Sequence, residues 1–134
     1  MFVDACAIIA LLSDEREAER ISGALATAKK RLTSPVAILE AVIGLARPDK
    51  FNMTVSSVEL IVMEFLDERG IEVRDLPPVK RATVLALSAA DKYRTGKNKL
   101  NIADCLHYAC AKYYRVPILA TDDEFRGTDL ETVP

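Results

Sequence analysis

Short apolar segments alternate with helical patterns along almost all of this 134-residue chain. The sequence predicts strands at 1–4, 31–33, 71–74, 116–120 and 130–133. It predicts helices at 5–12, 16–29, 35–46, 54–69, 79–93 and 102–114, with Ser34-Pro35 as a helix start and Gly70 as a helix stop. This order favours a three-layer α/β fold, in which a central, mainly parallel sheet has helices on both faces. We expect residues 1–134 to form one such domain.

The composition narrows the class of protein further. The apolar runs stay well below the roughly 18–20 residues that span a bilayer, and no basic segment opens the chain, so we expect a cytoplasmic protein that does not contact a membrane. The cysteines are odd in number and form no CxxC pair, which argues against a disulfide framework. A zinc site at Cys105, His107 and Cys110 is disfavoured, because Cys105 and His107 would point to nearly opposite sides of a helix.

Three acids stand out because each is the only charge in an apolar stretch. They are Asp4 in residues 1–13, Glu40 in 36–45 and Asp104 in 101–111. Each follows a predicted strand or lies in the first two turns of a helix, so right-handed crossovers would bring all three to the edge where the strands end. The segment Thr121-Asp122-Asp123-Glu124 follows another strand and offers a fourth acid, for which we prefer Asp122 over Asp123.

Each of these acids except Glu40 also has a simpler explanation. Asp4 and Asp104 could cap helices, and Asp122 or Asp123 could belong to a turn. Capping does not explain Glu40, which lies in the second turn of a helix that we expect to be buried on all sides. Carboxylates that converge on one apolar edge repel one another and are tolerated either with raised pKa values or with a bound cation, and an all-oxygen set suits Mg²⁺ or Mn²⁺. A bound ion of this kind most often serves phosphate chemistry.

Two further features surround this group of acids. Arg94, Lys97 and Lys99 lie in a polar loop before the Asp104 helix, where they would either bind phosphate groups or simply face solvent. His107 lies three residues after Asp104, on roughly the same helix face. We expect it to support the acids, with a role as general base as the alternative.

Four segments resemble the acidic motifs of the PIN domain, and more closely those of the VapC-type ribonuclease toxins. They read "FVDACAIIALL", "SPVAILEAV", "LNIADCLHYACA" and "PILATDDEFRGTDL", and they cover almost the whole chain in the family's order. The resemblance implies Mg²⁺- or Mn²⁺-dependent cleavage of RNA, with tRNA as a possible target. It places Asp4, Glu40 and Asp104 on the first three catalytic acids, with Asp122 or Asp123 as the fourth.

The resemblance also implies partners. A cognate antitoxin would block the site, the chain would form a homodimer and a toxin–antitoxin hetero-oligomer, and DNA would be contacted only through the antitoxin. One departure is Cys6, which stands where the family usually has serine or threonine, so that a weaker hydrogen-bonding group lies beside the ligands. Two alternatives stay open: a catalytically inactive module of the same fold that only binds a partner, and a phosphoacceptor receiver domain.

Overall fold

The fold is seen in a computed structural model that describes residues 1–97 and 99–133. Five strands form one sheet: β1 (Phe2–Val3), β2 (Leu32–Thr33), β3 (Glu72–Val73), β4 (Ile118–Leu119) and β5 (Thr132–Val133). All neighbouring strands are parallel, in the order β3-β2-β1-β4-β5. Phe2 pairs with Leu32 on one side and with Ile118 on the other, so the first strand of the chain is the central one. This confirms the predicted parallel α/β sheet.

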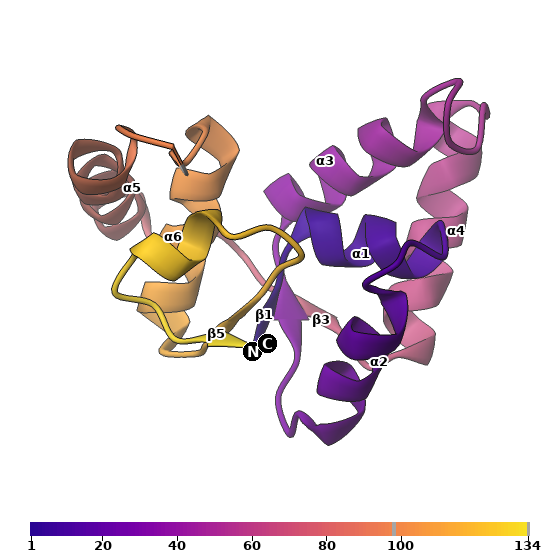
Figure 1. Ribbon diagram of the computed structural model, residues 1–134, viewed down its shortest axis with the longest axis horizontal. Coiled ribbons are helices and arrows are strands. Elements are labelled where there is room, and N and C mark those ends of the chain that lie inside the picture. The colour runs from indigo at the N-terminus through magenta and orange to yellow at the C-terminus, as the bar shows by residue number, and fades with distance from the viewer. Residues whose placement is uncertain (98, 134) are drawn as a thin grey trace.

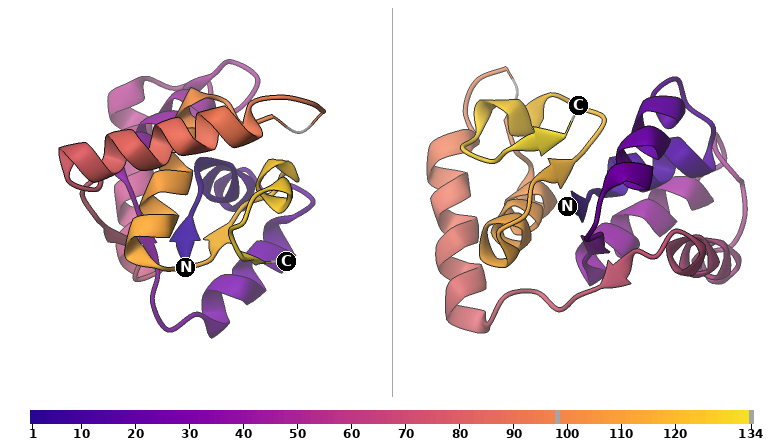
Figure 2. Two further views of the ribbon diagram at one scale, coloured as in Figure 1. Left: turned by 90° about the vertical axis from the view of Figure 1, so that its left-hand side faces the viewer. Right: turned by 90° about the horizontal axis from the view of Figure 1, so that it is seen from below.

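Within the described residues, six α-helices flank the sheet: α1 (Ala5–Leu12), α2 (Ala18–Thr27), α3 (Pro35–Ala46), α4 (Val55–Glu68), α5 (Val79–Tyr93) and α6 (Ile102–Tyr114). The crossovers β1-to-β2 and β2-to-β3 run in one direction across the sheet, and β3-to-β4 runs back. Right-handed crossovers therefore place α1–α4 on one face and α5 and α6 on the other. Figure 1 and the right-hand view of Figure 2 show these two groups of helices with the strands between them.

Local sequence explains several of the helix ends. Ser34 accepts a hydrogen bond from the backbone N–H of Ala37 at the start of α3, with Pro35 as its first residue. Gly70 adopts a positive φ of 61° just after α4, a conformation that glycine takes without strain. Among the described residues, no helix combines the length and apolar character that crossing a bilayer requires.

Two expectations need correction. Helix α3 is not buried on all sides, because Leu39 and Ile43 are 58% and 52% exposed on its outer face. The predicted elements also include nothing between the strands at 116–120 and 130–133, whereas the structure has a short 3-10 helix there, η1 (Glu124–Gly127), which is anchored by the fully buried Phe125.

Candidate functional site

An acid-lined cavity lies at the carboxyl edge of the sheet, beside the two central strands β1 and β4. This is where the crossovers change from one face of the sheet to the other, a position at which open parallel sheets commonly bind ligands. The cavity has a volume of about 170 Å³. Its lining comes from four parts of the chain: Asp4, Ala5, Cys6, Ile9, Glu40, Asn101, Asp104, Asp122 and Glu124. The topology thus brings together the four acids that the sequence singled out.

Asp4 directly follows β1, and only 3% of its surface is exposed. It occupies the N-cap position of α1, but its side chain makes no capping hydrogen bond, so capping does not explain this carboxylate. Its Oδ2 accepts a hydrogen bond from Cys6 Sγ at 2.8 Å. Its buried Oδ1 has no hydrogen-bond partner among the described residues. A buried oxygen left in this state is costly, and a cation would satisfy it.

Cys6 connects the ends of β1 and β4. Its sulfur accepts a hydrogen bond from the backbone N–H of Thr121 at 3.2 Å and donates its proton to Asp4. Burial, together with the neighbouring Asp4 charge, raises the pKa of the Cys6 thiol far above its usual range. Cys6 therefore remains protonated and acts as a hydrogen-bond donor to Asp4, the role that a serine or threonine hydroxyl would have there.

Asp104 serves as a helix cap and also lines the cavity. Its Oδ2 accepts from the backbone N–H of Asn101 at 2.8 Å, and the Asn101 side chain accepts from the Asp104 N–H at 2.8 Å, which forms a reciprocal capping box. Burial and the charges of Asp4 and Glu40 nevertheless raise its pKa to about 6, against opposing effects from the Asn101 hydrogen bond and His107. Asp104 therefore does cap α6, but its ionised carboxylate remains unfavourable in this site unless a cation is bound.

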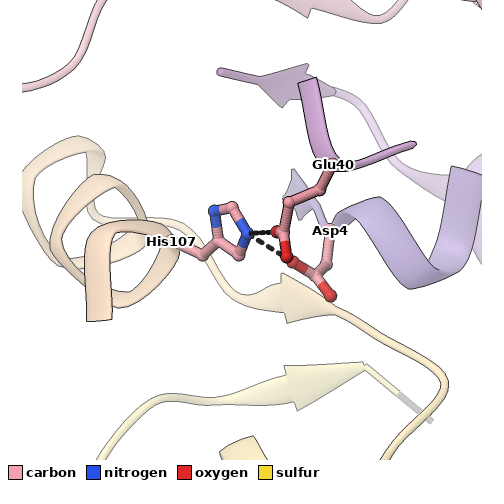
Figure 3. Close-up of side chains that lie close together, drawn as sticks. All are labelled: Asp4, Glu40 and His107. Carbon is pink, nitrogen blue, oxygen red and sulfur yellow. Dashed lines mark hydrogen bonds and ion pairs between the residues drawn. The ribbon is translucent and has the colours of Figure 1, made fainter. Parts of the chain in front are cut away.

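His107 comes from α6 and meets acids from two other elements, as Figure 3 shows. The side chain is fully buried, its Nε2 shares a hydrogen bond with Glu40 Oε1, and Asp4 Oδ1 lies 3.3 Å from the same nitrogen. Burial alone would lower the pKa of His107, but the Glu40 hydrogen bond and the charges of Asp4, Glu40 and Asp104 raise it. The sequence suggested a supporting role for His107, but not this direct contact with both carboxylates.

The segment after β4 contributes two acids to the cavity. Asp122 lines it, whereas the exposed Asp123 forms an ion pair with Arg126 at 2.8 Å. The second lining acid is Glu124, which the sequence analysis did not select; burial and the charges of Asp122, Asp104 and Asp4 raise its pKa to about 7. The only signal in the sequence was its place in the acidic run after β4. This geometry supports Asp122 as the fourth acid and adds Glu124.

The predicted basic residues lie on the surface beside this region. Arg94, Lys97 and Lys99 are exposed in the connection between α5 and α6, and none forms an ion pair with another described residue. A neighbouring hollow of about 220 Å³ is lined by Lys92 and shares Glu124 with the acid-lined cavity. Lys92 therefore lies next to the acid-lined cavity, because it lines the same hollow as Glu124.

The residues present fit a divalent cation. Single ligand atoms of Asp4, Glu40 and His107 all lie within 4.8 Å of one another. Asp104 and Asp122 add carboxylates to the same cavity. Carboxylate oxygens suit Mg²⁺ and Mn²⁺, and the buried Oδ1 of Asp4, which accepts no hydrogen bond from a described residue and lies 3.3 Å from His107 Nε2, is available as a ligand.

Comparison with known proteins agrees with this geometry. The PIN domain family model matches residues 1–130. Two ribonucleases of Mycobacterium tuberculosis are similar in sequence: VapC30, 31% identical over 99% of this chain and 98% of its own length, and VapC28, 32% identical over 98% and 96%.

Solved structures share the fold. A crystal structure of M. tuberculosis VapC20, described as a Sarcin-Ricin loop cleaving toxin, has a TM-score of 0.75 at 14% identity and covers 99% of this chain and 98% of that one. A toxin–antitoxin complex from Klebsiella pneumoniae has a TM-score of 0.69 at 16% identity, with 96% and 92% covered. With its parallel sheet, its acidic edge and these relatives along its whole length, the chain belongs to the PIN domain family and, within it, to the VapC ribonucleases.

Proposed function

We propose that this protein is a metal-dependent endoribonuclease toxin that hydrolyses phosphodiester bonds in RNA, with tRNA as the first substrate to test. The observation that carries the proposal is the convergence of Asp4, Glu40, Asp104 and Asp122 on one cavity at the carboxyl edge of the sheet. These residues would hold Mg²⁺ or Mn²⁺. When bound, the ion supplies an activated water nucleophile and neutralises charge on the phosphate.

The chain's own groups prepare the site for that chemistry. The Cys6 thiol and its contact with Thr121 hold Asp4 in one orientation across the β1–β4 junction. Glu124 adds a carboxyl group to the same cavity, and burial and the charges of Asp122, Asp104 and Asp4 raise its pKa to about 7 in the ion-free site. Arg94, Lys97 and Lys99, together with Lys92, offer exposed positive charge for the phosphates that flank the cleaved bond.

The partners follow from the family and from exposed apolar surfaces. An apolar groove of about 300 Å³ lies between α3 and α4 and includes Leu39, Val55 and Met63. A second exposed apolar surface includes Leu87 on α5 and Ile102 on α6, at 65% and 72% exposure. Surfaces of this kind commonly mark protein interfaces. They support a homodimer and an inhibitory antitoxin partner. The membership in the VapC family favours a place in the cytoplasm and contact with DNA only through the antitoxin.

The test is RNA cleavage by the purified protein with Mg²⁺ or Mn²⁺ and with EDTA. Asp4→Asn and Glu40→Gln keep the size of the side chain and remove its charge, so cleavage should fall by at least about a hundredfold. Glu64→Gln, on the exposed face of α4, is the matched control and should cleave at the wild-type rate. Near wild-type cleavage by Asp4→Asn would refute the assignment. Binding of an antitoxin without any cleavage would favour the inactive module instead.

A further inference from the structure

The structure provides a nitrogen donor in a cluster that was expected to consist of oxygen ligands. His107 is the only histidine in the chain, and it is fully buried. Its Nε2 faces Asp4 and Glu40, which come from the end of β1 and from α3 (Figure 3). The imidazole of α6 therefore faces both carboxylates with the same nitrogen atom.

The spacing of these atoms suits a shared ion. Ligand atoms about 2.1 Å from one ion and roughly 90–109° apart lie about 3.0–3.4 Å from each other. Asp4 Oδ1 and His107 Nε2 are 3.3 Å apart, within that range. Glu40 lies closer to His107 because the two share a hydrogen bond, but its side chain is 35% exposed and can swing outward.

Two observations point to a ligand in this place. Asp4 Oδ1 is buried and accepts no hydrogen bond from a described residue, although it faces the other two groups. The His107 ring cannot turn away, because it packs against Phe2 with ring centroids 5.6 Å apart. Its Nδ1 also has no described hydrogen-bond partner, so Nε2 is the nitrogen that meets polar groups.

We infer that Asp4, Glu40 and His107 bind one divalent cation together through a mixed set of nitrogen and oxygen ligands. Imidazole binds first-row transition metals far better than Mg²⁺, so this set selects Mn²⁺, Co²⁺ or Zn²⁺ over Mg²⁺. The inference rests on the proposed function, and it adds that His107 is a direct ligand which determines the choice of metal at that site.

The test is pulsed electron paramagnetic resonance of the untagged protein loaded with Mn²⁺. A nitrogen-14 coupling from a directly bound imidazole can come only from His107. His107→Gln replaces the nitrogen by an amide oxygen of similar reach, so the coupling should disappear and the preference for Mn²⁺ over Mg²⁺ should fall about tenfold or more. Cys6→Ser is the matched control, because it changes the contact to the other oxygen of Asp4 and should keep the coupling.

The outcomes separate this inference from the proposed function. Bound Mn²⁺ with RNA cleavage but no imidazole coupling would overturn the inference and leave the ribonuclease assignment intact. Failure to bind any divalent cation would overturn both. If His107→Gln does not fold, the wild-type spectrum and a competition between Mn²⁺ and Mg²⁺ on the wild-type protein still decide the question.

Discussion

Replacing Asp104 by asparagine should stabilise the metal-free protein at neutral pH. Burial and the charges of Asp4 and Glu40 raise the pKa of Asp104 from 3.8 to about 6, so the ionised carboxylate costs roughly 3 kcal/mol in the folded state at pH 7.5. The amide removes that charge and can still accept the hydrogen bond from Asn101. Because this bond is weaker to an amide than to a carboxylate, we expect a net gain of about 1–2 kcal/mol in the free energy of unfolding.

The gain in stability of Asp104→Asn over wild type should also decrease as the pH is lowered. A raised pKa means that the folded state binds the proton more tightly than the unfolded state. The contribution of Asp104 to stability is therefore fully present below its unfolded-state pKa of 3.8 and is lost as the pH rises through about 6. The advantage of Asp104→Asn over wild type should thus shrink by roughly 1.5 kcal/mol when the pH is lowered from 7.5 to 5.

Urea denaturation in EDTA at several pH values measures both effects, with Glu64→Gln as the control. The same Asp104→Asn protein should have lost RNA cleavage, so that greater stability and lower activity arise from one substitution. A variant that is less stable than wild type by the same amount at every pH would contradict the reasoning. In that case Asp104 would act only as a helix cap, without repulsion from the neighbouring acids.

Three further predictions concern other parts of the molecule. Millimolar Mn²⁺ should raise the melting temperature of the wild type in differential scanning fluorimetry, and Asp4→Asn should lose most of that rise, because the ion offsets the repulsion among the acids. Asp129→Asn should cost less than about 1 kcal/mol, because its ion pair with Lys112 is partly exposed. Since the Lys112 hydrogen bond lowers the pKa of Asp129, the stabilisation is present above about pH 4, and the difference from wild type in urea denaturation should vanish at lower pH. Gly44→Ala should stay within about 1 kcal/mol of wild-type stability in urea denaturation, since alanine favours helices. The new Cβ would lie 2.9 Å from Cδ1 of Ile9, a residue that lines the cavity, so calorimetry should show a severalfold weaker affinity for Mn²⁺. An unchanged affinity would mean that Ile9 moves away from the site.

The sequence was sufficient to predict the position of a site residue where the strand topology alone determined it. Asp4 and Asp122 follow the two strands that meet at the centre of the sheet, so the topology alone brought them together. The contact between Glu40 and His107 was not predictable in this way, because it depends on how α3 packs against α6 across the carboxyl edge of the sheet. Glu124 was missed because its position depends on the 3-10 turn anchored by Phe125, and short turns of this kind leave little periodic signal.

The exposed face of α3 shows a different limit of the sequence. A helix with apolar residues on nearly every side looked like one buried within the core. In the structure Leu39 and Ile43 face outward beside the α3–α4 groove. Hydrophobic periodicity indicates that a helix face is apolar, but it does not indicate whether the same chain or another chain buries that face.

The central position of β1 determines when the proposed catalytic site can form during synthesis. Phe2 pairs with Ile118, and the Cys6 thiol meets the backbone of Thr121, so both contacts join the start of the chain to a segment that is made late. A nascent chain that stops before β4 contains Asp4 and Glu40 but cannot close the cavity around them. Pairings between such distant segments also form slowly compared with local helices. The proposed RNA-cleaving activity therefore cannot arise on a nascent chain before β4 and Thr121 have been made.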